Sequence, residues 1–247
     1  MSKHIDVEAA FAGFVREHGG EVIEDIVGKS PDFRNADYLF RSKGVVAELK
    51  RLVENKSEDV NIQSKIQEKF DRWMKDGTIG PIYGRVRIES KTLPERCQRE
   101  LIEVYLPPIQ RRIIKANKQI KATLNHFGIG DGAGLLLLVN DGNYALEADA
   151  VFYLLNRILG SSFRQINSIV YCTVNMFASS PVTEKPTLIW AHVTRDGIPS
   201  IHSEFVAGLF RGWSSYLAKV KGEPIEAIYL DNPSIVPHIR YSRGDHQ

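Results

Sequence analysis

Cysteine is scarce in this chain: its 247 residues include two, Cys97 and Cys172, far apart and in no paired motif. A zinc site of the Cys-x-x-Cys type and a disulfide scaffold are therefore both excluded. Two isolated thiols are typical of a protein kept in a reducing compartment, so the expected location is the cytoplasm.

Long apolar runs and a strong net charge are also missing. The apolar run Leu135–Val139 is far too short to cross a bilayer, and the first residues show no signal-peptide core. We therefore expect no membrane partner. A net charge of +2 permits a nucleic-acid partner but does not argue for one.

The composition is that of an ordinary globular protein: 43% of the residues are hydrophobic and 25% are charged. Helical and strand patterns alternate along it, which favours an α/β or α+β fold. Apolar spacing predicts helices at 7–18, 62–76, 94–106, 109–124, 151–159 and 203–220. Strands are predicted at 21–27, 36–40, 45–52, 80–91, 135–140, 168–176, 187–194 and 227–230.

Three polar residues interrupt two neighbouring apolar strands. Asp37 lies in Ala36-Asp37-Tyr38-Leu39-Phe40, and Glu48 and Lys50 lie in Val45-Val46-Ala47-Glu48-Leu49-Lys50. Because Glu48 and Lys50 are two residues apart, they project from the same face of a strand. Two acids and a lysine on one face suit a divalent cation and an activated water.

The length of the turn decides whether Asp37 joins that face. A two-residue loop puts Asp37 opposite Lys50, whereas a four-residue loop, residues 41–44, puts it opposite Glu48. A three-residue loop would turn Asp37 to the other face. A catalytic site therefore requires an even loop, or a bulge that restores the parity.

Asp37 followed by Glu48-Leu49-Lys50 resembles the signature of the PD-(D/E)xK nuclease superfamily, which has the restriction-endonuclease-like fold. The order helix, strand and hairpin before Leu52 resembles the start of that fold. The resemblance implies a mixed central sheet flanked by helices. It also implies a Mg²⁺-dependent endonuclease, with Mn²⁺ as an alternative cation, in which Asp37, Glu48 and Lys50 are catalytic.

The resemblance also implies the cation ligands: Asp37, Glu48, the carbonyl of Leu49, and a glutamate of the first helix. Glu8 fits that last position better than Glu17 does. A literal Pro-Asp occurs at Pro31-Asp32, but its segment reads as a loop, so Asp37 is preferred and Asp32 is the alternative.

A basic stripe lies on the predicted helix after Pro108. It comprises Arg111, Arg112, Lys115, Lys118 and Lys121, with no acidic residue between Glu103 and Asp131. Such a stripe can neutralise phosphates, and a solvated helix face is the alternative. Gln63 and Gln119 lie in the neighbouring helices, but no pattern gives them a role.

The chain reads as one domain, residues 1–247. Its core covers about 5–52 and 109–194, a helical insertion covers about 53–108, and an α/β extension covers about 195–247. Pro107-Pro108 is expected to break the helix that Pro94 starts, and the tail 240–247 to be frayed. The glycines of 128–134 predict a turn, since a phosphate loop needs a strand before it and a helix after it. His192 and the three tryptophans fit apolar faces and are expected in the core.

The sequence therefore predicts a metal-dependent nuclease acting on phosphodiester bonds, with DNA as the expected partner. Cutting both strands of a duplex would favour a homodimer. A non-catalytic nucleic-acid-binding module and a protein-interaction module on the same fold are the alternatives.

Overall fold

The computed structural model gives the fold of most of the chain. It describes residues 4–53, 59–84, 86, 88, 90–144, 148–159, 163–180, 183–194, 201–231 and 240–242.

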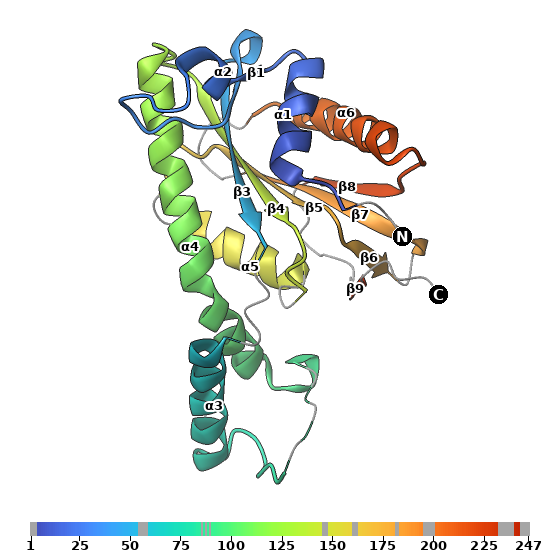
Figure 1. Ribbon diagram of the computed structural model, residues 1–247. Helices are drawn as coiled ribbons and strands as arrows, with labels where there is room; N and C mark the ends of the chain where they lie inside the picture. Colours follow the sequence, from blue (N-terminus) through green and yellow to red (C-terminus); the bar gives the residue numbers. More distant parts are fainter. Residues whose placement is uncertain are drawn as a thin grey trace.

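A mixed sheet forms the centre of the molecule (Figure 1). Its strand order is β1 (Glu21–Val22), β2 (Tyr38–Phe40), β3 (Val45–Leu52), β4 (Ala133–Asn140), β5 (Ser168–Thr173), β7 (Thr183–Thr194) and β8 (Ala227–Asp231). The strands β1, β2 and β3 form an antiparallel meander, and β3, β4 and β5 run parallel. The first half of β7 leaves the main sheet to pair with β6 (Phe177–Ser180), which pairs with β9 (Arg240–Ser242).

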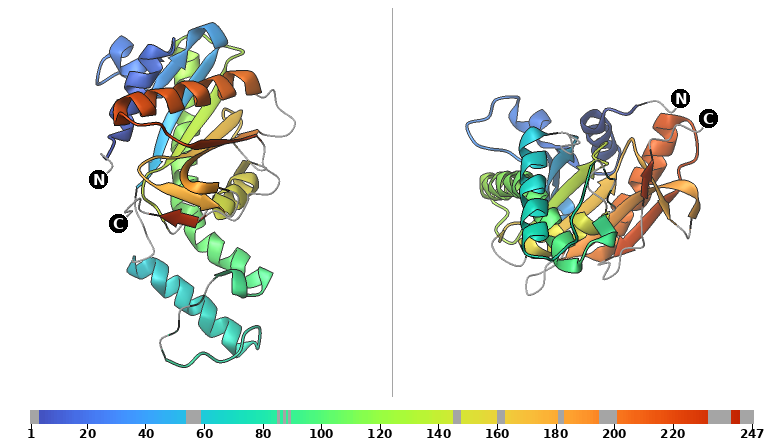
Figure 2. Two further views of the ribbon diagram at one scale, coloured as in Figure 1. Left: turned by 90° about the vertical axis from the view of Figure 1, so that its right-hand side faces the viewer. Right: turned by 90° about the horizontal axis from the view of Figure 1, so that it is seen from below.

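Helices cover both faces of this sheet. On one face, α1 (Val7–Glu17) and α6 (Ser203–Lys221) share a core with the strands, in which Trp213 stacks on Phe11 with 3.9 Å between ring centroids. On the other face, α4 (Glu95–His126) and α5 (Ala148–Leu159) form a second core with the opposite sides of the same strands. In the left view of Figure 2, α6 crosses in front of the sheet while α4 lies behind it.

The strand β4 lies between the two cores and is buried on both faces, as its unbroken apolar run predicts. The three tryptophans and His192 are buried, as expected; Trp190 and Trp213 belong to the core that α1 and α6 share with the sheet, whereas Trp73 is buried outside both cores. The C-terminal elements α6 and β8 belong to the core on the α1 side of the sheet, because α6 packs on α1 and β8 pairs with β7.

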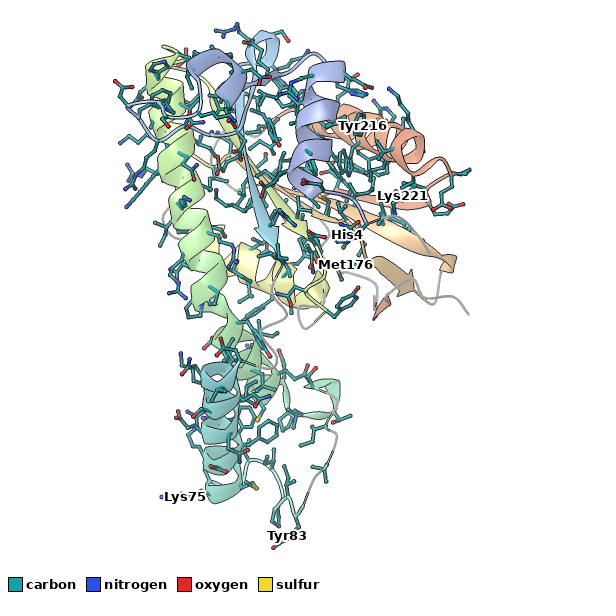
Figure 3. The ribbon with its side chains drawn as sticks, in the orientation of Figure 1. His4, Lys75, Tyr83, Met176, Tyr216 and Lys221 are labelled. Atoms are coloured by element: carbon teal, nitrogen blue, oxygen red, sulfur yellow. The ribbon has the colours of Figure 1, made fainter. Side chains whose placement is uncertain are left out.

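A helical arm projects from the carboxyl end of β3 (Figure 1). It contains α3 (Val60–Lys75), a loop with the single turn η3 (Ser90–Thr92), and the first part of α4. Glu100 joins the two helices, since its carboxylate pairs with Arg72, Lys69 and Arg96. Lys75 and Tyr83 mark the far end of the arm in Figure 3.

Two predictions about the prolines and the first strand were wrong. The helix α4 continues through Pro107 and Pro108, although both lack the N–H that an interior position uses. Buried Val104 and Ile109 hold the chain on either side. The strand expected over 21–27 stops after Val22, because β2 begins only at Tyr38 and offers it no further partner. The chain turns into the short helix α2 (Ile23–Val27) instead.

Three further segments differ from expectation. The described residues of 80–91 contain no strand, and Val86 and Ile88 are exposed without a neighbouring strand to cover them. The strand expected over 168–176 ends at Thr173, since Asn175 adopts a left-handed conformation with φ of 59° and redirects the chain into β6. In the tail, residues 240–242 pair with β6 rather than fraying, and 243–247 lie outside the described residues.

Candidate active site

The hairpin of β2 and β3 brings Asp37 opposite Glu48. Four residues join the strands: the single turn η1 (Arg41–Lys43), then Gly44 in the left-handed region with φ of 61°. Phe40 pairs with Val45 and Tyr38 with Ala47, so the next pair in this register is Asp37 with Glu48. Of the loop lengths considered, the four-residue one is correct, and the two carboxylates share the face that α4 covers.

Backbone contacts fix Asp37 at the start of β2. Its Oδ2 accepts a hydrogen bond from Leu49 N at 2.7 Å, and its carbonyl accepts one from Ile23 N at 2.9 Å. Burial raises the pKa of the Asp37 carboxyl, while the Leu49 N–H and the charge of Lys50 act in the opposite direction. Since the N–H and C=O of a strand residue point to the same side, the Leu49 carbonyl faces the gap that holds Asp37.

Glu48 is a buried carboxyl group between Asp37 and Lys50. The residue is 1% exposed, and its Oε1 pairs with the Lys50 ammonium. Its Oε2 has no hydrogen-bond partner among the described residues. Burial first, and then the nearby charge of Asp37, raise the pKa of Glu48 to about 8. A lone buried carboxylate oxygen is costly, and a cation placed there would compensate for its lost hydration.

Gln119 of α4 contacts Lys50 directly. Lys50 Nζ donates to Gln119 Oε1 at 3.1 Å, and Gln119 Nε2 donates to the carbonyl of Asn35 at 2.8 Å. One amide therefore links Lys50 to the segment that leads into Asp37. No local pattern indicated a role for Gln119, because only the packing of α4 on β3 brings residues 69 positions apart into contact.

The opposite side of β3 carries a second polar cluster that the sequence did not indicate. Arg51 donates to Asp141 Oδ2 from Nη2 at 2.6 Å and from Nε at 3.2 Å. Asp141 Oδ1 accepts from Asn175 Nδ2 at 2.8 Å, and Asn175 also bonds both backbone groups of Ile5. This cluster ties the ends of β3, β4 and β5 to the start of α1.

The remaining predicted acids lie further out. Glu8 has a largely exposed side chain and contacts Arg51 Nη1 through Oε1 at 3.5 Å. Its charge is near enough to raise the pKa of the Asp37 carboxyl. Nothing further tests Glu8 as a cation ligand, and that role stays a prediction. Glu17 pairs with Lys219 at 3.0 Å, and Asp32 is exposed in the loop before β2.

The residues present fit a hard divalent cation. Mg²⁺ is commonly held by one or two carboxylates, with water and substrate phosphate completing its shell. Asp37 and Glu48 supply two neighbouring carboxyl groups, the Leu49 carbonyl faces the same gap, and Glu48 Oε2 has no hydrogen-bond partner among the described residues. Over the described residues, no group of three or more His, Cys, Asp and Glu side chains is preassembled.

The basic stripe lies along the second half of α4. Arg111, Lys115, Lys118 and Lys121 are exposed, whereas Arg112 is half-buried and its Nη1 approaches the Pro108 carbonyl at 3.4 Å. Arg112 precedes Gln119 by seven residues, which is close to two helical turns, so it lies on the same side of α4 as the contact with Lys50. The basic stripe therefore lies on α4, the same helix that packs over Asp37 and Glu48.

Comparisons with family models, with curated proteins and with solved structures gave no match. Among the described helices, none combines the length and the apolar character needed to span a membrane.

Proposed function

We propose that this chain is a metal-dependent nuclease that hydrolyses phosphodiester bonds, with DNA as its substrate, on a restriction-endonuclease-like fold. The observation that carries the proposal is the hairpin register, which continues from Tyr38 and Ala47 to place Asp37 opposite Glu48, with Lys50 two residues further along the same face. The order α1, β1, α2, β2, β3, α3, α4, β4, with β4 parallel to β3, is in keeping with the resemblance noted in the sequence once the short helix α2 and the arm helix α3 are taken as additions.

Each residue has a distinct role in this proposal. Asp37 and Glu48, with the Leu49 carbonyl, would hold the cation. A bound Mg²⁺ or Mn²⁺ supplies Lewis-acid stabilisation of the phosphoryl oxygens and lowers the pKa of a coordinated water. Lys50, aimed by Gln119, would orient the attacking water and stabilise the negative charge that develops on the phosphate.

The basic stripe of α4 would neutralise phosphates on either side of the scissile bond. A homodimer would let two sites cut opposite strands. The cytoplasm remains the proposed location, in keeping with two buried cysteines that are both free thiols.

A second candidate is a nucleic-acid-binding module without catalysis. The observation in its favour is the contact between Lys50 and Glu48, which occupies one of the carboxylate oxygens that a cation would need. Cleavage, rather than binding, separates the two functions.

The deciding experiment is a cleavage assay on duplex, branched and single-stranded DNA and on RNA, with Mg²⁺, Mn²⁺ or EDTA. Asp37→Ala and Lys50→Ala are expected to reduce the wild-type rate by about 100-fold or more, as removal of a charge-stabilising group commonly does. Glu17→Ala, on the outer side of α1, is the control and should cut normally. Equal cutting by all variants, at equal thermal stability, would reject the assignment; binding without cutting would favour the second candidate.

A further inference from the structure

The Arg51 guanidinium is held along one edge by Asp141, and in the described part of the chain its other edge meets only the Glu8 carboxylate. Its Nε and Nη2 both donate to the same Asp141 oxygen, and Asp141 is itself buried and bonded to Asn175. Both Asp141 oxygens are thus engaged, and the plane of the guanidinium is fixed. Arginine has five N–H donors, so the end formed by Nη1 and Nη2 retains donors that Asp141 does not use.

The group at that open end is a weak partner. Glu8 Oε1 lies 3.5 Å from Arg51 Nη1, at the limit of a hydrogen bond, and the Glu8 side chain is 69% exposed. Ion pairs of this kind contribute little, because water and salt screen them. A phosphate carries oxygens at the spacing of the guanidinium fork and binds it through two parallel hydrogen bonds.

Arg51 also lies beside the candidate active site. It follows Lys50 directly in β3, and alternation along the strand sends the two cations to opposite faces of the sheet. Glu8 is near enough to Asp37 for the two charges to interact. A nucleic-acid strand crossing the end of β3 would therefore meet Lys50 on the α4 side and Arg51 on the α1 side.

We infer that Arg51 is a phosphate-binding residue: its open edge takes a backbone phosphate of the nucleic acid next to the scissile one, and Glu8 is displaced. Asp141 is the positioning residue that presents this edge. The inference rests on the proposed function, and it adds a contact on the face of the sheet opposite the basic stripe.

The test is equilibrium binding of a short fluorescein-labelled DNA duplex to the full chain in EDTA, measured over a range of KCl concentrations. Arg51→Gln is expected to weaken binding roughly tenfold at moderate salt, the effect of removing a hydrogen bond to a charged group. It should also make the plot of log K, the association constant, against log salt concentration less steep by about 0.9, the change expected when one phosphate contact is lost. Because Arg51→Gln removes the charge that faces buried Asp141, the double variant Arg51→Gln/Asp141→Asn is measured beside it and should show the same slope.

Glu8→Gln is the complementary variant. Removing the competing carboxylate should tighten binding about two- to fivefold, the range that an exposed ion pair spans. Glu17→Gln removes one negative charge from the same helix, far from Arg51 along α1, and is the matched control. It should change the affinity less.

The outcomes separate this inference from the proposed function. Unchanged salt slopes for both Arg51 variants at wild-type thermal stability, or equal effects of Glu8→Gln and Glu17→Gln, would overturn the role of Arg51. Continued Mg²⁺-dependent cutting by the wild type would then leave the nuclease proposal standing. A wild-type chain that binds no nucleic acid would overturn both.

Discussion

At the scale of single residues, the site is defined by one carboxylate in an unfavourable place. Glu48 lies in an apolar strand, nearly inaccessible to water, with one oxygen paired to Lys50 and the other without a hydrogen bond in the described part of the chain. The Lys50 ammonium compensates the first oxygen, whereas burial of the second is costly unless Glu48 is protonated or a metal cation lies beside it. The chemistry proposed for the site follows from this choice.

The first prediction concerns pH. The pKa of Glu48 is raised from its ordinary 4.5 to about 8, so between these values the folded chain without a cation binds more protons than the unfolded chain. Its free energy of unfolding should therefore fall as pH rises through this window. Cation binding must displace the proton, so Mn²⁺ affinity should rise with pH and level off above about 8.

Calorimetric titration of Mn²⁺ in buffers of different ionisation enthalpy would measure the released proton directly. Glu48→Gln, which cannot ionise at this position, should release fewer protons than the wild type and bind the cation weakly. An affinity that is independent of pH between neutrality and pH 8 would contradict the raised pKa as the controlling feature.

The second residue-scale prediction concerns Gln119, which would keep Lys50 oriented if a cation bound at Glu48 as proposed. Gln119→Met preserves the size of the side chain but removes both hydrogen bonds, to Lys50 and to Asn35. We expect kcat to fall about 10- to 100-fold with KM little changed, because a displaced catalytic group slows the chemical step. Gln110→Met, at an exposed position of the same helix, is the control. A change confined to KM would show that Gln119 acts in binding instead.

At the scale of elements, α4 combines two tasks. Its buried side packs on β3, β4 and α5, and its exposed side carries the basic stripe. The two prolines do not interrupt it, so one helix runs from the arm to the sheet (Figure 1). A nucleic-acid strand bound by the basic stripe would therefore be positioned relative to Glu48 and Lys50 by a single continuous helix.

The basic stripe leads to a prediction about how nucleic-acid binding depends on salt concentration. The triple variant Arg111→Ala/Lys115→Ala/Lys118→Ala should lower the slope of log K against log salt by about 0.9 for each phosphate that is no longer neutralised, up to about 2.7. Lys219→Ala on α6 also removes an exposed cation and should leave the slope unchanged. An unchanged slope for the triple variant would exclude the stripe from the binding surface.

At the scale of the whole molecule, the two cores depend on the close approach of β4 to the segment before β5. Gly134 N donates to Asn167 Oδ1 at 2.9 Å, while the Gly134 carbonyl accepts from Asn167 N at 2.8 Å. A Cβ at Gly134 would lie 1.8 Å from the Gln165 carbonyl oxygen, so a side chain does not fit there. The site on β3 is held in place by pairing with this strand.

Gly134→Ala should therefore destabilise the whole fold by about 3 kcal/mol, lowering the melting temperature by about 6–12 °C. Gly130→Ala, in the turn just before β4, is the matched control, since a Cβ there would meet nothing within 4 Å. Thermal unfolding followed by circular dichroism would compare them. Similar melting temperatures for the two variants would contradict the tight approach at Gly134.

Much of the fold follows from local pattern, because apolar spacing reports which side of each element is buried. The helices α1, α3, α5 and α6 and the strands β3, β4 and β8 lie where that spacing predicts. The failures have a common cause. The extent of β1, the course of α4 through its prolines and the pairing of β9 all depend on partners distant in sequence, which no local window contains.

For the site, the sequence by itself determined the residue types and their parity: Glu48 and Lys50 must share a face, and Asp37 can join them only across an even turn. The tertiary structure decided the rest. It chose the four-residue turn, buried Glu48, placed Gln119 on Lys50 and fixed Arg51 against Asp141. The physical reason is that parity along a strand is a local property of the backbone, whereas burial and hydrogen-bond partners are set by whichever distant segments the packed core brings together.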